Sequence, residues 1–115
     1  MTRQEAYRVK RFGQLIRIRP EFETEYIKYH GQVWPEVLQT ILDCNIHNYS
    51  IFLKDHVLYA YFEYTGTDFE ADMKKMAADP KTQEWWRIME PMQNPISTRA
   101  PGEWWAKMEE VFHTD

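Results

Sequence analysis

The sequence has little of what several classes of protein need. It contains one cysteine, Cys44, and only four glycines among 115 residues. A single thiol cannot form a disulfide within the chain, so Cys44 is expected to be a small core residue rather than a nucleophile. No apolar run approaches the roughly 20 residues of a membrane-spanning helix, and the amino-terminal Met-Thr-Arg-Gln-Glu-Ala lacks the apolar stretch of a signal peptide. We therefore expect a soluble, cytoplasmic protein that does not associate with membranes.

Positive charge and ligand-binding motifs are also scarce. Acidic residues outnumber basic ones by 18 to 14, which gives a formal net charge of −4. Basic residues gather only near the start, between Arg8 and Arg19, so binding to nucleic acid is not expected. The isolated glycines form no phosphate-binding loop, and the histidines are not spaced as metal ligands. The sequence therefore predicts neither a cofactor nor a metal ion.

Aromatic residues, by contrast, make up 16% of the chain. The length is that of one domain, and we take 1–115 as that domain. Hydrophobic periodicity divides it into strands and helices. The predicted elements are, in order, a strand (11–19), a helix (21–30), a helix between a break at Trp34-Pro35 and a left-handed cap at Asn45, two strands (46–53 and 57–65) joined by a tight turn, a helix (68–78), a helix from Pro80 that carries Met89, a loop (94–102) and a last strand (107–113).

This order of elements is the split βαβ pattern of a ferredoxin-like domain, an α+β fold with an antiparallel sheet. One face of the sheet is expected to lie under the helices. Because the strands carry aromatic and aliphatic residues on both faces, the other face would be a large apolar patch if it were exposed. We therefore predict a homodimer in which two such sheet faces pack together.

Three aromatic residues, Tyr26, His30 and Trp34, follow one another at intervals of four. On a helix this spacing places them on one face in consecutive turns. An imidazole readily carries protons near neutral pH, and an aromatic plate suits the apolar face of a sugar. The stripe is therefore the leading candidate for an active site, although Pro35 is expected to turn Trp34 away as an anchor at the helix break.

Two tryptophan pairs and the other histidines complete the candidates. Trp85 and Trp86 are neighbours on a predicted helix, where adjacent side chains point about 100° apart. One of the two can then enter the core while the other borders a cavity. His47 is ambiguous, His56 and His113 are expected to be solvated, and whether Trp104 and Trp105 reach a pocket is left open.

Taken together, these motifs resemble the L-rhamnose mutarotase family. The resemblance runs from about Phe12 to Pro95 and resumes at 109–113. It rests on four motifs in the family's order and spacing: Tyr26-x-x-x-His30-x-x-x-Trp34-Pro35-Glu36, His47-Asn48-Tyr49, Trp85-Trp86 and Asn94-Pro95.

The resemblance implies a dimeric α/β barrel that interconverts the α and β anomers of a 6-deoxy-hexose without a cofactor. It implies that His30 is the proton donor and that four residues bind the sugar, namely Tyr26, Tyr49, Trp85 and Trp86. Ring opening requires only an acid and a base within hydrogen-bonding reach of the sugar. The expected substrate is L-rhamnose.

Two departures from the family pattern keep other substrates and functions open. Gly31 follows the histidine where the family usually has a proline soon afterwards, and the segment 97–106 differs from the bacterial pattern. L-fucose is therefore an alternative sugar. Alternatives of other classes are a cofactor-free or haem-degrading monooxygenase, in which His30 would serve oxygenation or bind iron, and a non-catalytic sugar-binding domain.

Overall fold

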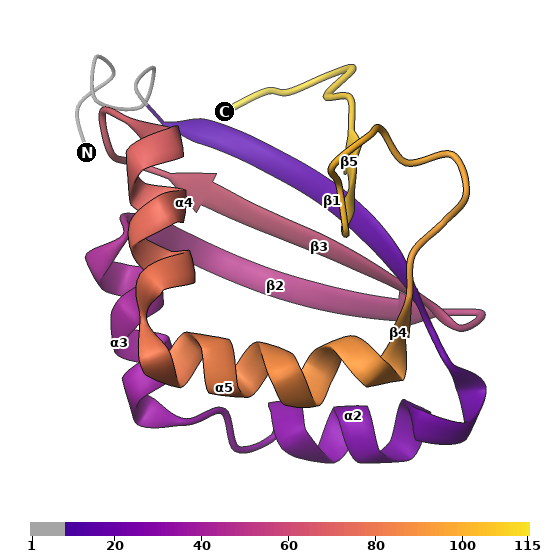
Figure 1. Ribbon diagram of the computed structural model, residues 1–115. Helices are drawn as coiled ribbons and strands as arrows, with labels where there is room; N and C mark the ends of the chain where they lie inside the picture. The colour runs from indigo at the N-terminus through magenta and orange to yellow at the C-terminus, as the bar shows by residue number, and fades with distance from the viewer. Residues whose placement is uncertain (1–8) are drawn as a thin grey trace.

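The computed structural model describes residues 9–115 (Figure 1). Residues 1–8 of the predicted domain, including Arg8, lie outside the described part. The elements are, in chain order, β1 (Lys10–Ile18), η1 (Pro20–Phe22), α2 (Glu23–His30), α3 (Pro35–Asp43), β2 (Ile46–Lys54), β3 (Val57–Tyr64), α4 (Phe69–Ala78), α5 (Pro80–Met89), η2 (Glu90–Met92), β4 (Gln93–Asn94) and β5 (Ala106–Met108).

The strands form one antiparallel sheet in the order β2-β3-β1-β4, with β5 also paired to β1. In this order β3 lies between β1 and β2, as the split βαβ pattern requires. The helices lie on one side of a curved sheet (Figure 1). The predicted α+β fold is therefore confirmed.

Backbone conformations at the predicted breaks agree with the sequence. Trp34 is extended, with ψ of 134°, and Pro35 begins α3. Asn45 is left-handed, with φ of 65°, and ends the helical region before β2. Asp55 and His56 both have positive φ and form the two-residue turn between β2 and β3, as hairpin geometry favours.

The predicted last strand was wrong beyond Met108. Residues 109–115 have no regular secondary structure, and Phe112 is 79% exposed. The fourth strand of the ferredoxin-like pattern is instead β4, which pairs with Arg17 and Ile18 directly after η2. β5 takes the same edge of β1 further along, opposite residues 13–15. The alternation at 107–113 was misleading because alternation alone does not make a strand: only residues 106–108 pair with β1.

The two faces of the sheet differ in burial. Ile16 and Ile18 of β1 and Leu58 of β3 point toward the helices and join a buried cluster with Val37 and Met89. Alternate residues point the other way, where β2 and β3 expose large apolar rings. Phe52, which pairs with Tyr59 in this register, is 64% exposed.

An irregularity in β2 decides which of its side chains face the helices. The register with β3 shifts between His47 and Ser50, and Asn48 at the shift has a positive φ of 49°. A bulge of this kind inserts one residue and reverses the alternation beyond it. Tyr49 therefore faces the helices, with its ring centroid 5.6 Å from that of Phe62. His47 pairs with Glu63 on the opposite face.

The contact between Gly66 and the buried Tyr64 predicts a specific intolerance to a methyl group. A Cβ added at Gly66 would lie 2.3 Å from the Tyr64 hydroxyl oxygen, which donates to Asp72 at 2.5 Å. We expect Gly66→Ala to lower the free energy of unfolding by about 1–3 kcal/mol, as overpacking does. Urea denaturation measures this change.

Gly31→Ala is the matched control, because a Cβ at Gly31 would meet its nearest neighbour, a carbonyl oxygen, at 3.4 Å. Its stability should stay within about 1 kcal/mol of the wild type or rise slightly. Equal losses in the two variants would contradict the role assigned to the Gly66 contact.

Candidate functional site

Helix α2 brings two of the predicted site residues together. Tyr26 is 4% exposed and His30 is half-buried one turn later. Their rings stack, with centroids 4.2 Å apart and planes inclined by 27°. Trp34 lies beyond the end of α2, in the extended residue before α3, and packs against Trp85. The first two members of the stripe thus share a face, whereas the third is a packing residue at the helix break, as expected.

The imidazole of His30 is held in one tautomer. Its Nδ1 lies 2.9 Å from the backbone carbonyl oxygen of Tyr26, which only accepts hydrogen bonds, so Nδ1 carries the hydrogen. Nε2 then has a lone pair. Burial lowers the pKa of His30 below its ordinary value of 6.5, and the hydrogen bond to the Tyr26 carbonyl offsets part of this effect. At neutral pH the ring is therefore mainly uncharged, and Nε2 can accept a proton.

Helix α5 supplies an aromatic wall beside the imidazole. The helix begins at Pro80, and Asp79 caps it by accepting a hydrogen bond from the Thr82 N–H at 2.9 Å. This start places Trp85 in the core, edge-on to His30 at 5.5 Å between ring centroids.

Trp86 points in a different direction, as adjacent helical residues must. It is 37% exposed and borders a shallow surface hollow of about 260 Å³ with Gln83, Arg87 and Glu90. Among the described residues, no aromatic contact joins Trp86 to the rings of Tyr26 or His30. The structure therefore brings together Tyr26, His30 and Trp85 but leaves Trp86 outside this cluster.

Tyr49 reaches the same region from the sheet. Tyr49 is 40% exposed, and desolvation by the surrounding protein raises its pKa above the usual value. The proximity of Tyr26 raises this pKa further, and a hydrogen bond from the side chain of Gln14 lowers it. Tyr49 and Tyr26 are therefore close enough in space to interact electrostatically. Gln14 was not predicted as a site residue, but the sequence offered an indication of it. It is a polar residue on the face of β1 that otherwise bears Phe12, Ile16 and Ile18.

Gln93 was also not among the predicted site residues, and its side chain contacts Tyr26 directly. Its Nε2 donates to the Tyr26 hydroxyl oxygen at 3.2 Å, and its Oε1 accepts from Nε1 of Trp104 at 2.8 Å. Burial raises the pKa of Tyr26 to about 12, although the hydrogen bond from Gln93 works against the rise. The long connection from β4 to β5 therefore reaches the site through Trp104. No periodicity marked Gln93 in advance.

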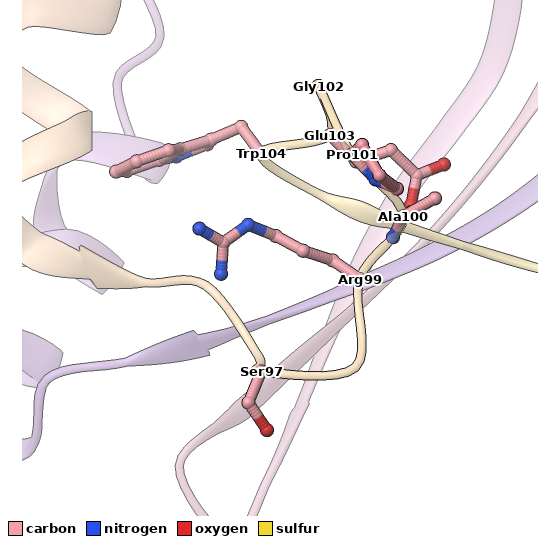
Figure 2. A pocket seen from close by; sticks show the side chains of 7 residues that line it. All are labelled: Ser97, Arg99, Ala100, Pro101, Gly102, Glu103 and Trp104. Carbon is pink, nitrogen blue, oxygen red and sulfur yellow. The ribbon is translucent and has the colours of Figure 1, made fainter.

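Residues of that connection line an open surface hollow of about 530 Å³. Figure 2 shows its lining, in which the side chains of Arg99 and Trp104 extend in the same direction from the loop. The remaining lining residues are Ser97, Ala100, Pro101, Gly102 and Glu103. This hollow lies in the segment 97–106, one of the two places where the sequence departs from the family pattern.

The other histidines lie apart from this cluster. His47 is on the opposite face of the sheet, where it pairs with Glu63 in the strand register. His56 and His113 are exposed, as expected; Nδ1 of His56 lies 2.5 Å from a carboxylate oxygen of Glu23, and His113 contacts Asp115 at 3.1 Å. Within residues 9–115 no three His, Cys, Asp or Glu side chains gather as a metal site would need.

None of the helices in residues 9–115 combines the length and the apolar character that a membrane crossing demands.

The fold and the cluster define a small α+β protein with a proton-accepting imidazole between a ferredoxin-like sheet and its helices. The family model for L-rhamnose mutarotase matches residues 11–114. The chain therefore belongs to the L-rhamnose mutarotase family.

Individual relatives agree with this assignment. An L-rhamnose mutarotase of Oceanobacillus iheyensis is 35% identical over 107 residues, which cover 93% of this chain and all of the relative. One of Phocaeicola vulgatus is 32% identical over 115 residues, with the same coverage of both chains. The crystal structure of L-rhamnose mutarotase from Formosa agariphila matches with a TM-score of 0.70 at 23% identity, and the match covers 92% of this chain and 99% of the other. That last likeness concerns the fold.

Proposed function

We propose that the protein interconverts the α and β anomers of L-rhamnose by proton transfer at His30. The activity follows from family membership, which makes the protein an isomerase, a mutarotase of L-rhamnose metabolism. The observation that supports the assignment of His30 is its fixed tautomer, with Nδ1 bound to the Tyr26 carbonyl and the Nε2 lone pair free.

Anomer exchange needs a proton to leave one sugar oxygen and another to arrive at its neighbour. The anomeric hydroxyl loses its proton while the bond between C1 and the ring oxygen breaks, and the ring oxygen gains a proton. The open-chain aldehyde then rotates and closes on its other face, which reverses both transfers. No net proton or electron is consumed, so an acid and a base suffice.

In the proposed mechanism His30 is the proton donor to the ring oxygen. Because its pKa is lowered, the resting imidazole is uncharged and must first take up a proton at Nε2. The anomeric hydroxyl is the group of the bound sugar that has to lose one. The two sugar oxygens are attached to the same carbon. Nε2 of one imidazole can therefore accept the proton from the anomeric hydroxyl and donate it to the ring oxygen.

The sugar-binding roles of the remaining candidates are part of the same proposal. Tyr26 and Tyr49 offer hydroxyl groups that are close enough to interact electrostatically, and Trp85 offers an apolar wall beside His30. Trp86 is partly exposed on the next face of α5, and we assign it to the mouth of the site.

The relatives named above favour this reaction over a monooxygenase, a haem-degrading protein or a non-catalytic sugar-binding domain. L-fucose remains the alternative 6-deoxy sugar, since the segment 97–106 departs from the family pattern. A cytoplasmic location is also proposed. The thiol of Cys44, which is buried and free, suits a reducing compartment.

We propose in addition that two copies pack through the exposed faces of their sheets. Phe52 and Tyr59 are cross-strand neighbours on that face, and both are exposed to solvent in one chain. Met108 of β5, which lies opposite Gly13 on β1, is exposed as well. Exposed apolar side chains gathered on one face of a sheet are typical of an interface.

Anomer exchange measured by saturation-difference NMR tests the reaction and the role of His30. We expect the wild type to accelerate exchange of L-rhamnose, and of L-fucose to a smaller extent. We expect His30→Ala to lose about 10²–10⁴-fold, which is the usual contribution of a positioned acid or base. Circular dichroism reports whether the fold is retained.

The matched control is His56→Asn, which removes an exposed imidazole and keeps a residue that tolerates the left-handed backbone at this position. It should keep the wild-type rate. Full activity in a folded His30→Ala variant would exclude the assigned role, and wild-type binding without accelerated exchange would exclude the mutarotase.

Light scattering after gel filtration tests the dimer. The wild type should have twice the mass of one chain. Phe52→Glu places a charge on the proposed interface and should shift the mass toward that of one chain. Leu38→Glu makes the same kind of change at an exposed apolar residue of α3 and should leave the dimer intact. A wild-type monomer, or equal behaviour of the two variants, would refute the sheet-to-sheet arrangement.

A further inference from the structure

Two side chains outside the proposed acid–base group connect Tyr26 to the loop of residues 95–105. Nε1–H of Trp104 donates to Oε1 of Gln93 at 2.8 Å, and Nε2 of Gln93 donates to the hydroxyl oxygen of Tyr26 at 3.2 Å. Gln93 is 5% exposed, and Tyr26 is buried as well. A chain of three side chains thus ends on the hydroxyl group of Tyr26, which the proposed function assigns to sugar binding.

These two hydrogen bonds run in one direction, from Trp104 through Gln93 to Tyr26, and Trp104 sets that direction. An indole N–H is a donor only, whereas an amide offers a carbonyl oxygen on one side and an NH₂ group on the other. The carbonyl of Gln93 must therefore face Trp104, and its NH₂ group must face Tyr26. With the amide turned round, two donors would meet at Trp104, and a buried donor would lose its acceptor at a cost of about 1–3 kcal/mol.

The direction decides what the Tyr26 hydroxyl can do. Its oxygen already accepts a hydrogen bond from Gln93, so its own hydrogen must point elsewhere. This hydrogen is therefore available to an acceptor other than Gln93. Because burial raises the pKa of Tyr26 to about 12, the hydroxyl keeps this hydrogen at neutral pH.

We propose that Gln93 and Trp104 are positioning residues that hold the Tyr26 hydroxyl as a hydrogen-bond donor to an oxygen of the bound sugar. The inference rests on the proposed function, since the sugar is the acceptor. Neither residue touches the reacting atoms. Both act through Tyr26.

The proposal makes the loop part of the site. Hydrogen bonds within the loop hold its shape. Among them, Nη1 of Arg99 donates to the Ile96 carbonyl at 3.0 Å, and the Ala100 N–H donates to Oε1 of Glu103 at 3.0 Å. The position of the indole therefore follows from the loop, and the orientation of the Gln93 amide follows from the indole.

The test compares three variants by the kcat and KM of anomer exchange on L-rhamnose. Trp104→Phe removes the indole N–H and should lower kcat about tenfold, because the amide is then free to turn. Gln93→Glu should lower kcat at least as much, because its carboxylate accepts from both neighbours and captures the Tyr26 hydrogen. Trp105→Phe makes the same ring change one residue later, at a tryptophan packed against the core, and should leave kcat within about twofold.

A double-mutant cycle separates positioning from a general structural role. In a Tyr26→Phe background no hydroxyl is left to orient, so Trp104→Phe should have less than about a twofold further effect. An undiminished tenfold effect in that background would overturn the proposal. So would equal losses in Trp104→Phe and Trp105→Phe.

NMR of the side-chain amide of Gln93 keeps this inference distinct from the proposed function. Its two proton signals should shift both in Trp104→Phe and in Tyr26→Phe, and unchanged signals would disprove the hydrogen-bonded chain. If the chain is present but the wild type exchanges no sugar, the proposed function fails and the positioning of a sugar fails with it.

Discussion

The hydrogen bond from Nδ1 of His30 to the Tyr26 carbonyl is the interaction on which the site depends. It joins residues one turn apart on α2, so it forms as soon as the helix does. It fixes the tautomer and directs the other nitrogen away from the backbone. Burial then keeps the ring uncharged at neutral pH, because solvent is not available to stabilise the imidazolium. A lone pair at a defined position is what proton transfer requires.

The surrounding fold supplies what the helix alone cannot. Trp85 comes from α5, Tyr49 from β2, Gln14 from β1 and Gln93 from β4. These residues meet only when the sheet closes over the helices. The bulge at Asn48 is a small part of this assembly with a large effect, since it turns Tyr49 toward the helices and His47 away from them.

Much of this arrangement could be predicted from the sequence, and the limits have physical causes. The spacing of Tyr26 and His30 predicted their shared face, because helical geometry is local. The order of strands and helices predicted the fold, and Pro35 and Asn45 marked breaks through their backbone preferences. The extent of the last strand was beyond such local signals, because it depends on which residues pair with the edge of β1. Gln93 was missed for a related reason, since its partners, Tyr26 and Trp104, are set by tertiary contacts.

The pH dependence of kcat/KM for anomer exchange tests the central claim most directly, since this quantity reports the pKa of the essential group in the free enzyme. If uncharged His30 starts the reaction, the rate should fall as the pH is lowered through one inflection below 6.5 and should be constant from there to neutral pH. The inflection should be absent from the residual rate of His30→Ala. A rate independent of pH across this range, or an inflection that persists in the variant, would contradict the account.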